Sequence, residues 1–327
     1  MDLTTKYLGL ELRNPLVASA GPLTGTYDGI MRLAEAGVGA VVLPSLFEEQ
    51  IRRDDEKDWR VPAQGAEATD YLPQSGAPSR PAWYVSLIEK AAANAGVPVI
   101  ASLNGTSPGG WTDYATTLAE AGAAAIELNI YYLPGDPLFP ARDVERRYIE
   151  VLTTVKAVAG VPVAVKVAPF LSSFGEMAVL LDQAGADGLV LFNRFMQTDI
   201  DPETFTVSTG FRLSHPSEGA LPRSWISRLR GKVSCSLAGS TGVETGADVA
   251  AYLLAGADVV MSTSSLLRHG PAHAGALLEG LVSWGDRKGF ASVTEFRGML
   301  SAVSGHPVAG RTGYLSAVEQ ASHAYAR

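Results

Sequence analysis

The stretch LAEAGVGAVVLPS, residues 33–45, decides the fold, because its phrase returns at 118–129 (LAEAGAAAIELN), 180–193 (LLDQAGADGLVLFN) and 253–264 (LLAGADVVMSTS). Each copy begins as the end of an amphipathic helix, closes on a glycine and runs almost at once into an apolar strand. Glycine ends a helix at low cost because it adopts the left-handed conformation without steric strain. Strands this apolar indicate a parallel sheet that helices cover.

Further strands fit between these copies, at 14–21, 97–105, 161–169 and 232–240. About eight strands alternating with helices is the number that closes a (β/α)8 barrel. A doubly wound open sheet is the alternative, but that fold needs a G-x-G-x-x-G turn after its first strand, and SAGPLTG stands there instead. The sequence therefore predicts an α/β fold of the (β/α)8 type, a TIM barrel.

The pattern predicts a single domain over residues 1–327, since no linker separates a second one. A hairpin at 3–14 is expected to plug the barrel floor, the barrel spans about 14–285, and helices at 286–327 pack outside it. Long connections after strands belong to the C-terminal face, where barrel active sites lie. Three such connections are longer than a barrel needs: 45–81, 129–147 and 193–224.

Composition excludes several classes of function. The chain is 46% hydrophobic with a net charge of −8 and no basic stripe, which argues against nucleic-acid binding. Its one cysteine, Cys235, excludes disulfides, cysteine-based metal sites and iron–sulfur clusters on this chain. The N-terminus lacks a signal-peptide core, and no apolar run is long enough to cross a bilayer. We therefore expect a cytoplasmic protein without a membrane segment or a metal.

Strand alternation predicts that Lys166 points into the barrel. In VPVAVKVAP, Lys166 shares a face with two alanines, which suit the crowded axis, whereas the valines suit the interface with the helices. In AAIELN, Glu127 and Asn129 share the polar face on the preceding strand. Because a lone buried lysine is costly, Glu127 could be the buried counter-ion of Lys166, an arrangement that a purely structural role would also explain. The alternative is a lysine at the strand end that extends its ammonium group to solvent.

Three amides end strands on the same rim, at Asn104, Asn129 and Asn193. One such amide would be an ordinary turn residue. Three amides and a lysine together suit a flat heterocycle with hydrogen-bonding groups in its plane.

The loops after the seventh and eighth strands are rich in small and hydroxyl residues, and barrels often bind phosphate with these two loops. Plain helix capping would explain either loop alone. A phosphate there and a polar ring over Lys166 describe flavin mononucleotide (FMN), whose reduced form a nearby cation stabilises. The loop residues are Gly239, Ser240, Thr241 and Gly242, then Ser262, Thr263, Ser264 and Ser265.

From about residue 3 to 305 the chain resembles the dihydroorotate dehydrogenase family, in its soluble FMN-binding branch. The most specific segments are LGLELRNPLVASAG (8–21), ELN (127–129), VKVAPF (165–170), GVETGADVAAYLLAGADVVMST (242–263) and TEFRGML (294–300). The absence of an anchoring N-terminal extension is the feature that places it with the soluble branch. The resemblance implies a (β/α)8 barrel with FMN at the C-terminal face, and a homodimer.

The resemblance also implies roles for individual residues. Ala20 and Gly21 would lie against the flavin, and Lys166 would contact its pyrimidine edge. Asn129 and Asn193 would bind the substrate ring stacked on the flavin. Gly239 and Gly242, with Thr263 and Ser264, would hold the phosphate. The further candidates for cofactor binding, taken from the strand ends and loops, are Ser45, Asn104, Ser240 and Ser262.

Departures from the family pattern cluster around the substrate. The family loop that reads like ELNLSCPN carries the Cys or Ser base, whereas this chain has ELNIYYLPG, with Tyr132 at the base and Pro134 at a later asparagine. Pro44 stands where the family usually has a lysine, although Ser45 is kept. Ala68, in ATDYLPQ, stands at an asparagine that holds the substrate ring.

A tyrosine at the position of the base changes the expected chemistry. A free phenol has a pKa near ~10, so it serves better as an acid than as a base near neutrality. Tyr132 could therefore protonate a substrate carbon while FMN delivers hydride to a double bond, or it could stack on the substrate. Tyr131 and His215 are the alternatives for proton transfer.

The sequence thus predicts an FMN-dependent oxidoreductase that acts on the CH–CH or C=C bond of a small cyclic substrate. One alternative is a genuine dihydroorotate dehydrogenase of pyrimidine biosynthesis. A second is a phosphate-binding lyase or aldolase with Lys166 as its Schiff-base amine. A third is a non-catalytic flavoprotein subunit. The expected ligand is a small molecule, and the sequence does not select the electron acceptor.

Overall fold

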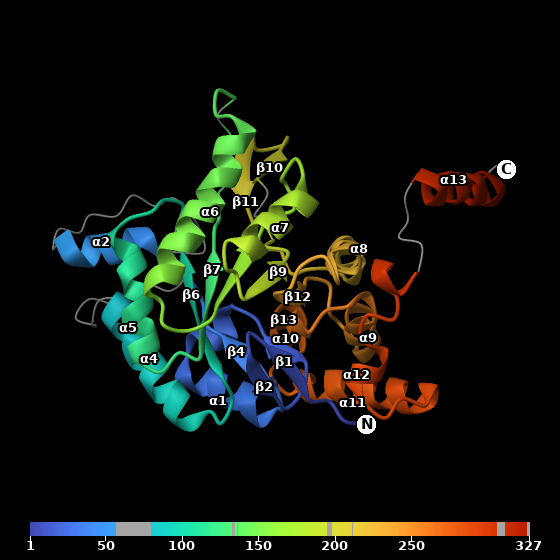
Figure 1. Cartoon of the computed structure of the whole chain (residues 1–327), viewed down its shortest axis with the longest axis horizontal. Helices are drawn as coiled ribbons and strands as arrows, with labels where there is room; N and C mark the ends of the chain where they lie inside the picture. The colour runs from blue at the N-terminus through green and yellow to red at the C-terminus, as the bar shows by residue number, and fades with distance from the viewer. Residues whose placement is uncertain are drawn as a thin grey trace.

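The computed structural model describes residues 1–56, 80–132, 135, 137–194, 198–210, 212–305 and 311–325. Within these ranges, eight parallel strands close into a barrel with helices around it, which confirms the predicted (β/α)8 fold (Figure 1). The strands are β3 (Leu16–Ala18), β4 (Ala40–Val42), β6 (Val99–Asn104), β7 (Ala125–Asn129), β8 (Val163–Val167), β9 (Gly188–Leu191), β12 (Ser236–Ser240) and β13 (Val259–Ser262). Each pairs with its neighbour in that order, and β13 pairs with β3 to complete the ring.

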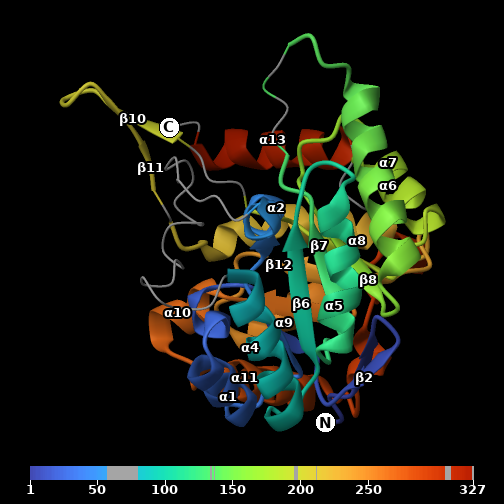
Figure 2. The same ribbon diagram turned by 90° about the vertical axis from the view of Figure 1, so that its left-hand side faces the viewer.

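The helices that follow the strands form the outer layer of the barrel (Figures 1 and 2). They are α1 (Tyr27–Glu35), α4 (Arg80–Asn94), α5 (Tyr114–Glu120), α6 (Ala141–Val158), α7 (Phe174–Gln183), α8 (Ala220–Leu229), α9 (Gly246–Ala255), α10 (Ser264–His269) and α11 (His273–Lys288). Short elements lie between them: η1 (Pro22–Gly25), β5 (Leu46–Phe47), α2 (Glu48–Glu56), η2 (Gly110–Asp113) and η3 (Pro216–Gly219).

The glycine of the repeated phrase ends its helix in all four copies, as predicted. Gly37, Gly122, Gly185 and Gly256 have φ values of +102°, +103°, +96° and +116°. These values lie in the left-handed region that other residues reach only with strain. The four turns send the chain directly from a helix into β4, β7, β9 and β13, so the repeat explains half of the barrel.

The predicted N-terminal hairpin is present as β1 (Thr5–Tyr7) and β2 (Leu10–Leu12), an antiparallel pair. Its buried side chains Tyr7, Leu8 and Leu12 belong to the same cluster as inward-facing residues such as Ala164 and Val190. The hairpin therefore fills one end of the barrel axis, and the opposite, C-terminal ends of the strands are left for the site.

The three long connections leave the C-terminal ends of β4, β7 and β9, as expected. The connection after β9 contains a hairpin of β10 (Thr198–Asp201) and β11 (Thr206–Thr209), which projects from the body of the barrel (Figure 2). Ala68 and Pro134, two of the predicted departures, lie outside the described residues.

The C-terminal helices differ from one another in their packing. In α12 (Val293–Phe296), Val293 and Phe296 are buried against the barrel. After η4 (Ala302–Ser304), helix α13 (Arg311–Tyr325) stands apart from the barrel in Figure 1, and its residues 314–324 are exposed. None of the described helices is both long and apolar enough to cross a membrane. The cytoplasmic location therefore stays a prediction.

Candidate active site

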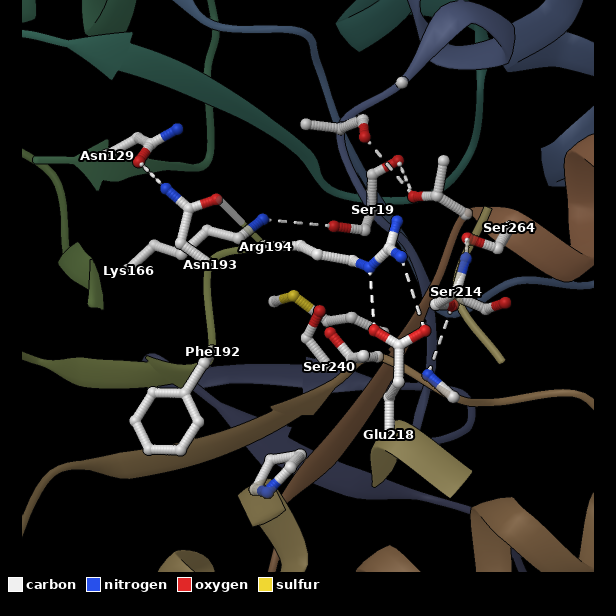
Figure 3. A pocket seen from close by; sticks show the side chains of 18 of the residues that line it. Ser19, Asn129, Lys166, Phe192, Asn193, Arg194, Ser214, Glu218, Ser240 and Ser264 are labelled. Carbon is white, nitrogen blue, oxygen red and sulfur yellow. Dashed lines mark hydrogen bonds and ion pairs between the residues drawn. The ribbon is translucent and has the colours of Figure 1, made fainter. Parts of the chain in front are cut away.

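A cavity of about 880 Å³ opens at the C-terminal ends of the strands (Figure 3). This volume falls within the range of roughly 300–1,000 Å³ that ligand sites occupy. Many of the predicted site residues line this cavity. Those from β3, β4, β7, β8 and β9, or from the residues directly after these strands, are Ala20, Gly21, Ser45, Asn129, Lys166 and Asn193. Those at β12 and β13 are Ser240, Gly242, Ser262, Thr263 and Ser264.

Lys166 and Glu127 form a buried ion pair beneath this cavity. The two residues point inward from β8 and β7, and Lys166 Nζ lies 3.3 Å from Glu127 Oε1. Their side chains are 10% and 1% exposed, so the predicted counter-ion relationship is confirmed. Nζ also donates to Ser19 Oγ at 3.5 Å. Glu127 Oε2 has no hydrogen-bond partner among the described residues.

Two amides meet side by side on the cavity wall. Asn193 Nδ2 donates to Asn129 Oδ1 at 2.6 Å (Figure 3). Asn129 lies beside Lys166 in the strand register, and its Nδ2 donates a long hydrogen bond of 3.5 Å to Ser45 Oγ. The Ser45 hydroxyl is also 2.8 Å from that of Ser102. Lysine, amides and hydroxyls therefore converge at one end of the cavity.

Two predicted cofactor residues do not line the cavity. Asn104 is buried, and its Nδ2 has no partner within the described part of the chain. A Cβ atom on Gly239 would lie 2.2 Å from Cδ1 of Tyr252, so the glycine makes room for that ring. The Tyr252 hydroxyl then donates to the carbonyl oxygens of Ser240 and Thr241 at 2.7 and 2.6 Å. Gly239 thus makes room for the Tyr252 ring behind the loop, and its contact with a phosphate stays a prediction.

The loops after β12 and β13 are joined by Ser214, which the sequence reasoning missed. The buried Ser214 hydroxyl accepts a hydrogen bond from the Gly242 N–H at 3.3 Å. The backbone N–H of Ser214 donates to Ser264 Oγ at 2.9 Å. Thr241 and Gly242 have φ values of +83° and +68°, which turn the loop sharply toward this contact. The signal was LSHPSEG at 213–219, a short polar stretch within the connection after the sixth strand.

A second group missed from the sequence is the pair Arg194 and Glu218, which lines the outer cavity. Arg194 donates from Nε and Nη2 to the two carboxylate oxygens at 2.9 and 3.3 Å (Figure 3). The His215 N–H donates to Glu218 Oε1 at 2.7 Å. Burial opposes ionisation of this carboxylate, but the hydrogen bonds from Arg194 and His215 outweigh it and lower the pKa of Glu218.

The residues predicted for proton transfer lie off the cavity wall. The Tyr132 ring packs edge-on against Phe139, with centroids 6.1 Å apart, and beneath the Arg147 guanidinium at 4.3 Å. Tyr131 is likewise absent from the lining residues. His215 caps η3 and contacts Ser217 Oγ at 2.9 Å. The geometry therefore gives no support to proton transfer by these three side chains.

The chemistry of the cavity fits FMN. At one end, Lys166 and the amides of Asn129 and Asn193 supply hydrogen-bonding groups for a polar ring. At the other end, Ser240 and Ser264 supply hydroxyls for a phosphate. The fold and the cavity together are those of a barrel protein whose C-terminal face suits a phosphate-bearing cofactor.

Comparison with known proteins identifies the family. Residues 2–284 match the family model described as dihydroorotate dehydrogenase. The chain therefore belongs to the dihydroorotate dehydrogenase family, as the sequence motifs indicated. Enzymes of this family depend on FMN and act on CH–CH groups, and the chain is an FMN-dependent oxidoreductase of that kind.

Individual relatives are similar at modest identity. The chain is 28% identical over 304 residues to the dihydroorotate dehydrogenase B (NAD(+)) catalytic subunit of Methanothermobacter thermautotrophicus, covering 91% of this chain and 98% of the relative. The subunit of the same name from Pyrococcus furiosus is 27% identical over 309 residues, or 93% and 100% of the two chains. A putative dihydroorotate dehydrogenase A (fumarate) from Aeropyrum pernix is 26% identical over 304 residues, or 91% and 97%.

Proposed function

We propose that the chain transfers hydride between FMN and a CH–CH or C=C bond of a small cyclic substrate. The observation that carries this proposal is the Asn193–Asn129 amide pair on the same cavity wall as Lys166. When bound, FMN supplies the hydride chemistry. Lys166 would face the pyrimidine edge of the flavin, and the hydroxyls of Ser240 and Ser264 would bind its phosphate.

The amide pair suits a particular kind of ring edge. Asn193 Nδ2 donates to Asn129 Oδ1, and one N–H of Asn129 Nδ2 reaches Ser45 Oγ, so Asn193 Oδ1 and the second N–H of Asn129 Nδ2 are the groups that would meet a ligand. One accepts and the other donates, which complements a ring that carries a neighbouring N–H and C=O. Dihydroorotate itself is the second candidate, favoured by the names of the relatives. Pro44, in place of the family lysine, lies on the cavity wall and favours a different substrate.

Proton transfer is proposed for Ser45 in preference to Tyr132. Ser45 lines the cavity next to Asn129, and the Ser102 hydroxyl at 2.8 Å offers a partner that can relay its proton. Tyr132 could reach the same space only by leaving its contacts with Phe139 and Arg147. In this proposal, Tyr132 therefore shapes the loop after β7.

The two other classes of function are less well supported. A Schiff-base enzyme needs a neutral lysine amine, whereas Lys166 is held against the Glu127 carboxylate. A non-catalytic flavoprotein would not need the amide pair of Asn129 and Asn193 beside Lys166. The homodimer expected from the resemblance stays a prediction, which sedimentation of the purified protein would test.

The experiment is to purify the protein, record its visible flavin absorbance and compare the affinities of the apoprotein for FMN and riboflavin. Riboflavin lacks the phosphate, so we expect it to bind roughly 100-fold more weakly, the loss of about two charge-assisted hydrogen bonds. Equal affinities would contradict a phosphate site between the β12 and β13 loops. Reoxidation of the reduced protein by NAD+, fumarate and oxygen would then compare candidate acceptors.

A further inference from the structure

The Glu127–Lys166 pair has a geometry that structural support alone does not require. Both side chains are buried at the barrel axis, and their separation of 3.3 Å joins the two strands that carry Asn129 and the cofactor lysine. A buried ion pair of this kind often contributes little net stability, because desolvation offsets the attraction. Because stability alone gains little from such a pair, its place beneath the cavity points to a functional role.

Glu127 also fixes the direction of the lysine. An ammonium group has three donors, and the described contacts of Nζ are with Glu127 Oε1 and Ser19 Oγ. Lys166 lines the cavity, whereas Glu127 does not. The carboxylate therefore holds the ammonium from below, and a remaining N–H is available to a ligand above it.

We propose that Glu127 is a positioning residue that sets the reduction potential of the bound FMN, by holding Lys166 and offsetting its charge. The inference rests on the proposed function, in which Lys166 faces the flavin. Reduction adds negative charge to the flavin, so a neighbouring cation favours it and a neighbouring carboxylate opposes it. The pair presents a weaker positive field than a lone lysine, which keeps the potential lower.

The direction in which each substitution should shift the midpoint potential of FMN follows from this arrangement. Glu127→Gln leaves the lysine charge uncompensated, so the midpoint potential of FMN should rise. Lys166→Gln leaves the carboxylate, so the potential should fall. The double variant E127Q/K166Q removes both charges and should lie nearer to wild type than either single variant does. A purely structural pair would lower the unfolding temperature without moving the potential in opposite directions.

The test is the midpoint potential of the holoprotein, measured anaerobically against reference dyes near neutral pH. For E127Q we expect at least a tenfold increase in the ratio of reduced to oxidised flavin at a fixed potential, which is about 30 mV for a two-electron couple. Glu48→Gln is the matched control, because Glu48 is also buried but accepts hydrogen bonds from the Thr106 N–H and the Ser107 hydroxyl and not from a lysine. Its potential should stay at the wild-type value.

The outcomes separate this inference from the proposed function. An E127Q protein that holds FMN at an unchanged potential would overturn the inference alone, and so would single variants that shift in the same direction. A wild-type protein that binds no flavin would overturn both. If E127Q does not fold, Glu127→Asp keeps the charge on a shorter side chain, and its potential should lie above that of wild type. A potential at or below the wild-type value would contradict the inference.

Discussion

Asn193 and Asn129 come from segments 64 residues apart, yet the Nδ2 atom of Asn193 donates to the Oδ1 atom of Asn129 at 2.6 Å. The contact orients both amides and leaves Asn193 Oδ1 and one N–H of Asn129 Nδ2 for a ligand. It also links the end of β9 to β7 above Lys166. The proposed substrate site depends on this pair.

Replacing either amide should weaken catalysis without removing the cofactor. Asn193→Ala leaves Asn129 Oδ1 without its donor, and the loss of this partly buried hydrogen bond costs about 1–3 kcal/mol, which lowers kcat/KM roughly 10–100-fold. Steady-state kinetics on holoprotein with equal FMN content would measure the effect. Asn94→Ala is the control, since Asn94 is exposed on α4 and donates to the Lys90 carbonyl oxygen within that helix. An N193A enzyme with normal kcat/KM would remove the pair from the site.

Two hydroxyl deletions distinguish the proposed proton-transfer groups. Ser45→Ala should slow the proton-transfer step by about 10²–10⁴-fold, the usual contribution of a general acid or base. Tyr132→Phe keeps the ring that packs against Phe139, so we expect less than roughly a tenfold change. Single-turnover kinetics with a solvent deuterium comparison would report this step. The reverse pattern would restore the role that the sequence suggested for Tyr132.

Gly239 provides a test of packing against ligand binding. Gly239→Ala places a methyl group against the Tyr252 ring, and overpacking of this kind costs about 1–3 kcal/mol of unfolding free energy. Gly175→Ala is the control, because its Cβ would meet Trp225 at an ordinary 3.8 Å. Urea denaturation would compare the two variants. A G239A protein of normal stability but weak FMN affinity would show that the glycine serves the phosphate.

Stability should fall at alkaline pH because of buried tyrosines. Burial raises the pKa of Tyr148 from 10.0 to about 12, and it also raises the pKa values of Tyr7, Tyr84 and Tyr252. Below pH ~10 these phenols are protonated in both states; above it, the unfolded chain loses its protons first. Between its pKa in the unfolded chain and its pKa in the folded protein, each tyrosine then lowers the unfolding free energy by roughly 1.4 kcal/mol per pH unit.

The measurement for this prediction is the unfolding free energy between pH 9 and 12, with tyrosinate absorbance followed in parallel. Tyr148→Phe should reduce the slope above pH ~10, because it removes one of the shifted groups. A stability that stays flat across this range would mean that the phenols ionise in the folded state.

Much of the architecture could be predicted, because its causes are local. The helix–glycine–strand phrase specified four turns, and strand alternation placed Lys166 and Glu127 on the inner face. The side-chain directions that the sequence could not give have tertiary causes. Gly239 in β12 makes room for Tyr252, which lies in α9, and the direction of the Tyr132 ring depends on Arg147 and Phe139. The place of Tyr132 in the family motif predicted a role for this residue, but it could not predict the orientation of the side chain.

Ser214 and the Arg194–Glu218 pair were missed for a related reason. All three residues lie in the long connection after β9, where no sequence periodicity applies. Ser214 matters through its contacts with the loops after β12 and β13, and Arg194 and Glu218 through the ion pair that they form across the connection. Serine, arginine and glutamate are also common in exposed loops. Only the fold shows that these ones border the cavity.

The most direct measurement is anaerobic mixing of the FMN-loaded protein with dihydroorotate and with dihydrouracil, while the visible flavin band is followed in wild type and in N129A/N193A. The account predicts that at least one of these rings bleaches the wild-type flavin rapidly, and that the double variant keeps its FMN but bleaches at least roughly 100-fold more slowly. Bleaching by dihydroorotate alone would make the chain a dihydroorotate oxidant. Equal bleaching in both proteins, or none in wild type, would contradict a substrate site built on the two amides.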